Sequence, residues 1–264
     1  MSTAVVNGIE LFFERRGSGP RLLFINGSGA TLAGSGMLLR PFTEAFDVVA
    51  HDQRGLGRSA RPPAPYTMAD YAADALALLD HVGWATCRVV GLSFGGMVAQ
   101  ELAVTAPERV ERLALLCTSP GGAEGSSFPL HTVYDLDDAE RAERMVPILD
   151  TRFTPDWLAA HPQDQALVDY LARPAGARSA EDRRGERAQL DARSHHDVVD
   201  RLERITAPTL VASGRYDGIA PVDNGQRIAE RVPDARLAIY EGGHAFVVQD
   251  PAALPEILAF LGDG

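Results

Sequence analysis

Three residue types that cooperate in nucleophilic hydrolysis occur at Ser93, Asp217 and His244. A serine hydroxyl is a weak nucleophile until a base takes its proton, and a histidine base needs a carboxylate to fix its tautomer and stabilise the imidazolium. Each residue alone has an ordinary explanation, because serine and aspartate are common in turns and a lone histidine is often only a surface residue. Since all three follow predicted strands, in the order Ser, Asp, His, the combination predicts a catalytic triad.

The serine lies in the stretch Gly91-Leu92-Ser93-Phe94-Gly95, between a short apolar run and a helical pattern of small residues. This context predicts a sharp turn from a strand into a helix, which projects the hydroxyl away from the sheet. The glycines two positions to either side let neighbouring backbones approach without a Cβ clash. We therefore expect Ser93 at a nucleophile elbow.

The glycine-rich loop from Asn26 to Gly29 follows a continuous apolar run. Its glycine spacing matches neither the dinucleotide-binding fingerprint nor the phosphate-binding P-loop, and no lysine follows it. A flexible strand exit is one explanation of the loop. In an ester-cleaving enzyme it would instead supply a backbone N–H to bind the developing oxyanion, and we expect the N–H groups of Ser28 and Phe94 to form that oxyanion hole.

The elements that must position these residues alternate between strand and helix over most of the chain. Short apolar runs predict strands buried on both faces, and apolar residues at helical spacing predict helices between them. The pattern predicts an α/β fold, with a mostly parallel sheet flanked by helices and ligands bound beyond the carboxyl ends of the strands. A hairpin is predicted around Asn7-Gly8 at a sheet edge. Strands are predicted at 22–25, 46–50, before Gly91, at 113–117, 209–213 and 237–240, with helices after Thr67, Ser93, Pro221 and Pro251.

Between residues 123 and 204 this alternation disappears. Charged helical patterns at 135–145 and 181–193, separated by prolines, predict a helical cap, or lid, inserted over the loop end of the sheet. We call residues 123–204 the cap segment, and the core would comprise residues 1–122 and 205–264. The arginines and acids of the cap segment are expected on a solvated helical face rather than in a substrate clamp.

A substrate pocket would be built from the cap segment and the glycine-rich loop. Large aromatic side chains suit an apolar acyl pocket, although aromatics in a helical insertion also form the core of that insertion. The expected pocket residues are Asn26, Gly27, Phe128, Tyr134, Phe153 and Trp157.

Composition excludes several function classes. The formal net charge of -11 and the absence of a basic cluster without interleaved acids argue against a nucleic-acid partner. No basic leader precedes the first apolar residues and no apolar run approaches the ~18 residues of a membrane span, so we expect a cytoplasmic protein without a membrane partner.

Redox and metal chemistry are not indicated either. Cys87 and Cys117 lie at the start of one predicted strand and the end of the next, too far apart to bridge, which predicts buried free thiols. His195 and His196 lack the spacing of a metal site, and the other histidines stand alone. We expect neither a metal nor a cofactor.

The chain resembles the α/β-hydrolase superfamily over essentially its whole length. The resemblance rests on INGSG after the first buried strand, DQRGLGRS after the second, GLSFGG at the elbow, SGRYDGIAP around the acid and EGGHAF at the histidine. Within the superfamily the chain is most similar to the carboxylesterase and 3-oxoadipate enol-lactonase branch, through its RVERLALLCTS strand and the phrase TRFTPDWL. The branch implies cofactor-free hydrolysis through an acyl-serine intermediate. Many relatives have His-Gly where this chain has Asn26-Gly27, a difference that leaves the backbone role intact.

These observations predict a serine hydrolase that acts on a small-molecule carboxylic ester or lactone. A carbon-carbon bond hydrolase of ring-cleavage products is the nearest alternative, because INGSG is similar to the HGSG loop of those enzymes. A small-molecule receptor on a hydrolase fold, whose cap responds to a ligand, is an alternative of another class. The sequence leaves the substrate and the oligomeric state open.

Overall fold

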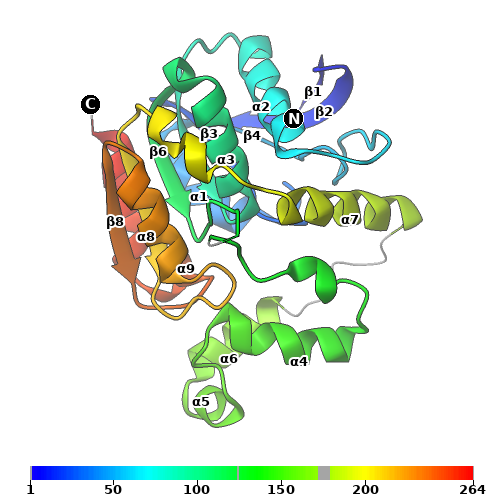
Figure 1. Cartoon of the computed structure of the whole chain (residues 1–264), viewed down its shortest axis with the longest axis vertical. Coiled ribbons are helices and arrows are strands. Elements are labelled where there is room, and N and C mark those ends of the chain that lie inside the picture. Colours follow the sequence, from blue (N-terminus) through cyan, green and yellow to red (C-terminus); the bar gives the residue numbers. More distant parts are fainter. Residues whose placement is uncertain (1, 124, 172–178, 264) are drawn as a thin grey trace.

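A single eight-stranded sheet organises the part of the chain that the computed structural model describes, residues 2–123, 125–171 and 179–263 (Figure 1). Its order is β1-β2-β4-β3-β5-β6-β7-β8. Strand β2 pairs antiparallel with β1 and β4, and all pairs from β4 to β8 are parallel, which confirms the predicted α/β fold. The strands are β1 (Ser2–Val6), β2 (Ile9–Arg16), β3 (Arg21–Ile25), β4 (Asp47–His51), β5 (Cys87–Leu92), β6 (Val110–Leu116), β7 (Thr209–Gly214) and β8 (Ala235–Tyr240).

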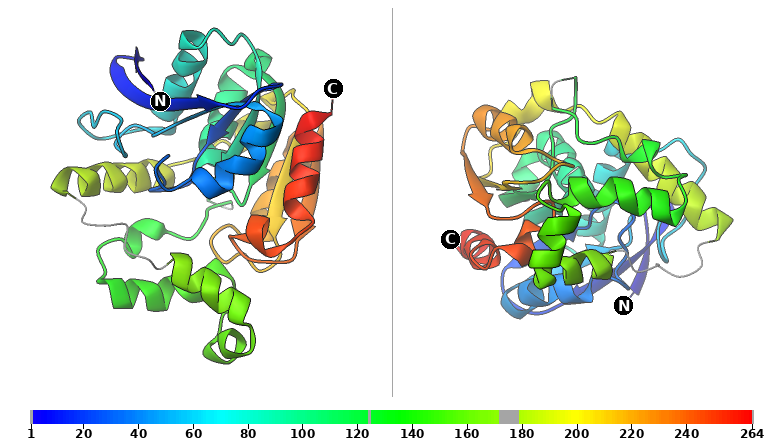
Figure 2. Two further views of the ribbon diagram at one scale, coloured as in Figure 1. Left: turned by 180° about the vertical axis from the view of Figure 1, so that it is seen from behind. Right: turned by 90° about the horizontal axis from the view of Figure 1, so that it is seen from below.

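Helices cover both faces of the sheet (Figure 2). Side chains alternate across a strand, so Leu23 of β3 joins the core of one face and Phe24 that of the other, and both are fully buried. One face carries α2 (Met68–His81), α3 (Phe94–Thr105) and α8 (Val222–Arg231), and the other carries α1 (Gly36–Ala45), α9 (Phe246–Gln249) and α10 (Ala253–Gly262). Burial on both faces explains the continuous apolar runs of the central strands.

Local signals in the sequence account for several element boundaries. The β1–β2 turn places Asn7 and Gly8 at φ values of 47° and 76°, the conformation that two-residue hairpins favour. The Thr67 side chain caps α2 by accepting from the Asp70 N–H, and Gly83 follows this helix with φ 73°. Helix α1 has no counterpart among the predicted helices, because a proline at position 41 interrupts its pattern.

The described part of the cap segment consists mainly of helices joined by loops. Helices α4, α5 and α6 lie together below the sheet in Figure 1, and α7 runs separately along the loop after β4. A Cβ on Gly185 of α7 would overlap the carbonyl oxygen of Gly55, so helix and loop are in direct backbone contact. The elements are η2 (Leu130–Thr132), α4 (Asp138–Leu149), α5 (Pro155–Ala160), α6 (Pro162–Leu171), α7 (Ala180–Ser194) and η3 (Val199–Arg204).

Both cysteines are buried and unpaired, as predicted. Burial raises the pKa of the Cys87 thiol to about 12 and that of Cys117 well above its ordinary value, so both thiols stay protonated near neutral pH. None of the described helices is both long enough and apolar enough to span a membrane.

Candidate active site

Ser93 occupies the predicted turn between β5 and α3. Its backbone has φ 54° and ψ -114°, a region that residues other than glycine seldom adopt. A Cβ on Gly95 would overlap the carbonyl oxygen of Ile25, and one on Gly91 would overlap that of Gly95. The two flanking glycines are therefore required by close packing of the turn against β3 and the start of α3.

In the structure, hydrogen bonds connect Ser93 to His244 and His244 to Asp217. Nε2 of His244 lies 3.0 Å from Oγ of Ser93, and Nδ1 of His244 lies 2.8 Å from Oδ2 of Asp217. An ionised carboxylate only accepts, so Nδ1 carries the proton and Nε2 is free to accept from the serine hydroxyl. This arrangement can move a proton from Ser93 to His244 while Asp217 stabilises the resulting cation.

Asp217 is held by its own loop. Its side chain is fully buried, and Oδ1 accepts the backbone N–H groups of Ile219 at 2.8 Å and Ala220 at 2.9 Å. These bonds occupy one carboxylate oxygen and leave the other facing His244. The aspartate is consequently fixed in orientation before any substrate binds.

The loop of Asn26 to Gly29 lies beside Ser93. A Cβ on Gly27 would lie 3.6 Å from Cβ of Ser93, so this glycine lines the space around the hydroxyl. Phe94 is the first residue of α3, and its N–H has no acceptor within the helix. Over the described residues, the Ser28 N–H has no hydrogen-bond acceptor either, whereas the Gly29 N–H donates to Oε1 of Gln189 at 2.7 Å. Two amide donors and the positive end of α3 can stabilise negative charge near Ser93.

Asn26 has a supporting place in this loop. The residue is buried, its Oδ1 accepts from Ser35 Oγ at 3.1 Å, and its carbonyl accepts from Gln53 Nε2 at 2.9 Å. These two hydrogen bonds link the loop to the segments that contain Ser35 and Gln53.

The carboxyl end of α4 supports the acid and histidine loops. The His244 N–H donates to the carbonyl of Leu149 at 2.6 Å, and the Gly218 N–H donates to that of Ile148 at 3.0 Å. Asp150, fully buried, accepts from Gln249 Nε2 at 3.0 Å, and Gln249 Oε1 accepts the Gly243 N–H at 2.9 Å. Sequence reasoning missed these supports, because carbonyl acceptors carry no sequence signal and an aspartate in a charged segment is unremarkable.

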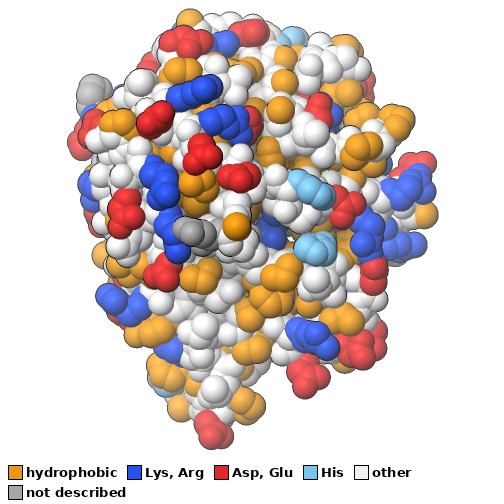
Figure 3. Space-filling view, in the orientation of Figure 1, with side chains coloured by type: hydrophobic (Ala, Val, Ile, Leu, Met, Phe, Trp, Pro, Cys, Tyr) orange, Lys and Arg blue, Asp and Glu red, His pale blue; other side chains and the backbone are white. Residues whose placement is uncertain are grey.

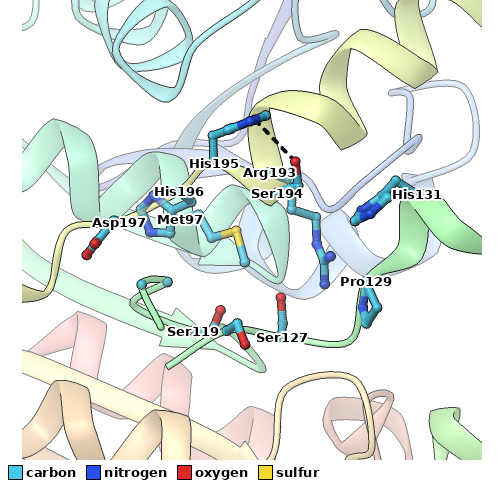
Figure 4. A pocket seen from close by; sticks show the side chains of 13 residues that line it. Met97, Ser119, Ser127, Pro129, His131, Arg193, Ser194, His195, His196 and Asp197 are labelled. Atoms are coloured by element: carbon cyan, nitrogen blue, oxygen red, sulfur yellow. Dashed lines mark hydrogen bonds between the residues drawn. The ribbon is translucent and has the colours of Figure 1, made fainter. Parts of the chain in front are cut away.

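A cavity of about 350 Å³ lies beyond the first turn of α3, and none of the three triad residues is among its lining residues (Figure 4). On the face drawn in Figure 3, the surface is hollowed beside histidine side chains. The lining includes Met97, one helical turn after Ser93, and Ser119, which follows Thr118; Thr118 Oγ1 donates to the Ser93 carbonyl at 2.7 Å. On the cap side it includes His131, Arg193 and His196.

The four predicted pocket aromatics do not line this cavity. Trp157 donates from Nε1 to Asp164 at 2.8 Å, and the Tyr134 hydroxyl donates to Glu186 at 2.7 Å, so both rings are held within the cap segment. The Phe153 side chain is buried. Phe128 contacts a residue of the cavity lining only through its backbone carbonyl, which accepts a hydrogen bond from Arg193. Over the described residues, no three His, Cys, Asp or Glu side chains lie close enough together to hold a metal ion.

Arg193 departs from the prediction of a solvated charged face. Arg184 on the same helix is 70% exposed, as that prediction requires, whereas Arg193 is only 5% exposed. The prediction is wrong at Arg193 because the last turns of α7 pack against the sheet core, where Ala188 and Ala192 are buried.

Comparison with known proteins identifies the family to which this fold belongs. The family model of the alpha/beta hydrolase fold matches residues 20–251. The chain is 29% identical over 238 residues to 3-oxoadipate enol-lactonase 2 of Acinetobacter baylyi, covering 89% of this chain and 85% of the relative. It is 31% identical over 236 residues to a Pseudomonas savastanoi protein named as a carbamate hydrolase (RutD), covering 88% and 89%. The enol-lactonase structure from Burkholderia xenovorans LB400 superposes with a TM-score of 0.81 at 24% identity, covering 99% of this chain and 100% of that one. The chain belongs to the α/β-hydrolase fold family.

Proposed function

We propose that the protein is a cofactor-free serine hydrolase that cleaves a carboxylic ester or lactone through an acyl-serine intermediate. The observation that carries the proposal is the hydrogen-bonded row from Ser93 through His244 to Asp217, at the carboxyl ends of β5, β8 and β7. The name of the Acinetobacter relative, an enol-lactonase, supports the lactone part of the proposal.

In the first half of the reaction the substrate carbonyl sits beside Ser93. Oγ attacks the carbonyl carbon while Nε2 of His244 takes the hydroxyl proton. The negative charge that develops on the carbonyl oxygen is bound by the N–H groups of Ser28 and Phe94. Collapse of the tetrahedral intermediate breaks the carbon-oxygen bond, and His244 returns its proton to the leaving alkoxide or enolate.

In the second half His244 removes a proton from water, and the resulting hydroxide attacks the acyl-serine. The same two amides bind the second oxyanion, and His244 protonates Ser93 as the acid product leaves. Asp217 stays ionised throughout and keeps the imidazole in the orientation that both proton transfers need.

In this proposal residues 123–204 form the cap, and residues 1–122 and 205–264 form the core. The supports from Ile148 and Leu149 give the cap a direct part in positioning the acid and histidine loops. The cap also supplies Gln189, which accepts the Gly29 N–H beside the proposed oxyanion hole.

An activity screen tests this function. Purified protein is assayed with 4-nitrophenyl acetate and butyrate, γ- and δ-lactones, an aryl carbamate and a ring-cleavage dienoate, with Ser93→Ala as the blank. We expect Ser93-dependent turnover of esters or lactones in preference to the dienoate. Turnover of the dienoate alone would identify a carbon-carbon hydrolase instead, and the absence of any Ser93-dependent turnover by folded protein would refute the proposal.

A further inference from the structure

Gln189 of α7 is a fully buried side chain that reaches the loop beside Ser93. Its Oε1 accepts the Gly29 N–H at 2.7 Å, a bond between residues 160 positions apart in the chain. The Gly29 N–H fixes which side-chain atom is the oxygen, because an amide nitrogen in that place would bring two donors together. Nε2 of Gln189 is buried and has no partner among the described residues. A leucine would fill the same place without burying an unpaired donor, so stability alone does not explain the glutamine.

The loop beside Ser93 forms a tight turn from Gly27 to Ala30. The Ala30 N–H donates to the Gly27 carbonyl at 3.3 Å. Gly29, the third residue of the turn, has φ 68°, whereas the φ of Ser28, the second residue, is not positive. Of the common turn types, only type II combines these two signs. In a type I turn the peptide between the second and third residues points the opposite way, so the Ser28–Gly29 peptide has two possible orientations.

Gln189 favours one of these orientations. The Gly29 N–H belongs to the Ser28–Gly29 peptide, and it donates to Oε1 of Gln189. A flip of this peptide would turn the Ser28 carbonyl oxygen toward Oε1, and two oxygens repel each other. The Ser28 N–H lies on the residue whose ψ changes in the flip. A flip would therefore displace this donor from Ser93 and weaken its bond to an oxyanion there.

Helix α7 is held on the core by contacts other than that of Gln189. Gly185 lies one helical turn before Gln189 on the same face, and its backbone packs against the carbonyl of Gly55. Arg61 forms an ion pair with Asp182 near the start of the helix. Removal of the Gln189 amide should therefore leave the helix in place and act through the lost hydrogen bond.

We propose that Gln189 is a positioning residue for the oxyanion hole. It holds the Ser28–Gly29 peptide in the type II orientation, so that the Ser28 N–H faces the carbonyl oxygen of a substrate at Ser93. The role rests on the proposed function, because it requires an oxyanion at Ser93. It also makes the oxyanion hole depend on the cap segment, since α7 supplies the glutamine.

Paired oxygen and sulfur esters test this role. The thiocarbonyl sulfur of 4-nitrophenyl thionobutyrate accepts hydrogen bonds weakly, whereas the carbonyl oxygen of 4-nitrophenyl butyrate accepts them well. The ratio of kcat/KM for the oxygen ester to kcat/KM for the thionoester therefore measures hydrogen bonding in the acylation step. The same rate ratio for hydrolysis by hydroxide gives the value without a protein. We expect wild type to favour the oxygen ester by a larger factor than hydroxide does.

The main variant is Gln189→Met, which keeps the length of the side chain and removes the oxygen that accepts the Gly29 N–H. It should lower the ratio roughly 10- to 100-fold, through a loss on the oxygen ester that the thionoester does not share. Gln189→Glu keeps an acceptor oxygen and should stay closer to wild type. Gln226→Met is the control and should leave the ratio unchanged, because Gln226 is an exposed residue of α8 that bonds to Glu230.

Gly29→Ala tests the same turn independently. The added methyl group meets no atom within 4 Å, but φ 68° disfavours any residue with a Cβ. The change therefore favours the flipped peptide and should also lower the ratio. Gly8→Ala is the matched control, because Gly8 has φ 76° and an added Cβ there also meets no atom within 4 Å. Gly8 lies in the turn of the β1–β2 hairpin, at an edge of the sheet.

An unchanged ratio in folded Gln189→Met, or equal losses on the two esters, would overturn the positioning role, as would a wild-type ratio no larger than that of hydroxide. If Gln189→Met does not fold, Gly29→Ala decides, and a ratio equal to that of Gly8→Ala would overturn the role. These results leave Ser93-dependent hydrolysis, and hence the proposed function, in place. The absence of any Ser93-dependent ester hydrolysis by wild type would instead refute the proposed function, and the role of Gln189 with it.

Discussion

The backbone N–H of His244 donates to the carbonyl of Leu149 at 2.6 Å, so the last turn of α4 fixes the loop that carries the histidine. A Cβ on Gly243 would overlap the same carbonyl, which explains why a glycine precedes His244. The histidine loop is thus shaped by the cap segment as well as by β8, and a change far from the substrate can alter catalysis.

The side chain of Gln249 offers a direct test of this support. Gln249→Leu removes the oxygen that accepts the Gly243 N–H, and the leucine side chain is close in size to the glutamine side chain. We expect kcat to fall roughly tenfold, because small misplacements of a catalytic group are costly, while KM changes little. The measurement is steady-state kinetics with 4-nitrophenyl butyrate. Arg236→Met, which breaks a half-exposed ion pair with Glu256, is the control, and equal effects of the two variants would contradict the prediction.

Asp217→Asn should remove catalysis while preserving the fold. The asparagine Oδ1 can still accept from Ile219 and Ala220, but its NH2 group would face Nδ1 of His244 and favour the wrong histidine tautomer. A fall in kcat of about 10⁴ is expected on that basis. Asp223→Asn at the start of α8 is the matched control, since Asp223 is exposed. Near-normal kcat in folded Asp217→Asn would argue against the assigned role.

Gly95→Ala should destabilise the protein by distorting the elbow. The added methyl group would overlap the carbonyl oxygen of Ile25, and backbone cannot rotate away as a side chain can. We expect a loss of about 1 to 3 kcal/mol in the free energy of unfolding, measured by urea denaturation. Gly36→Ala meets no atom within 4 Å and should change stability by less than about 1 kcal/mol. Similar losses at the two positions would show that packing is not the cause.

The buried His196 predicts a loss of stability in acid. Its folded-state pKa of about 3 lies below the ordinary value of 6.5, so between these pH values the unfolded chain binds a proton that the folded chain does not. Stability therefore falls as pH decreases below 6.5, by about 2 kcal/mol from this residue at pH 5. Burial also lowers the pKa of His51, which adds in the same direction.

Urea denaturation at pH 7 and pH 5 measures this effect. His196→Gln should lose about 2 kcal/mol less than wild type between the two pH values, whatever its stability at pH 7. An unchanged difference would show that His196 does not titrate in this way.

The sequence predicted the parts of the protein that depend on local pattern. Continuous apolar runs located the central strands, and strand ends placed Ser93, Asp217 and His244 at one rim of the sheet. These inferences work because parallel strands all run in the same direction. A residue that directly follows such a strand therefore lies at the edge of the sheet where the carboxyl ends of the strands meet.

Features that depend on tertiary contacts could not be predicted. Arg193 shares a charged helix with the exposed Arg184, and only the packing of α7 against the core separates a buried cation from a solvated one. Trp157 suits a pocket by its chemistry, but its Nε1 binds Asp164 of the neighbouring helix. Helix α1 was missed because Pro41 lies inside it.

Covalent labelling of Ser93 tests the central claim most directly. The protein is treated with a fluorophosphonate, digested, and mapped by mass spectrometry, with Ser93→Ala and His244→Ala in parallel. Activation of Ser93 by His244 predicts a single label on the peptide that contains Ser93, its absence in Ser93→Ala and much slower labelling in His244→Ala. A label on another residue, or ester hydrolysis undiminished in Ser93→Ala, would contradict the assignment of Ser93 as the nucleophile.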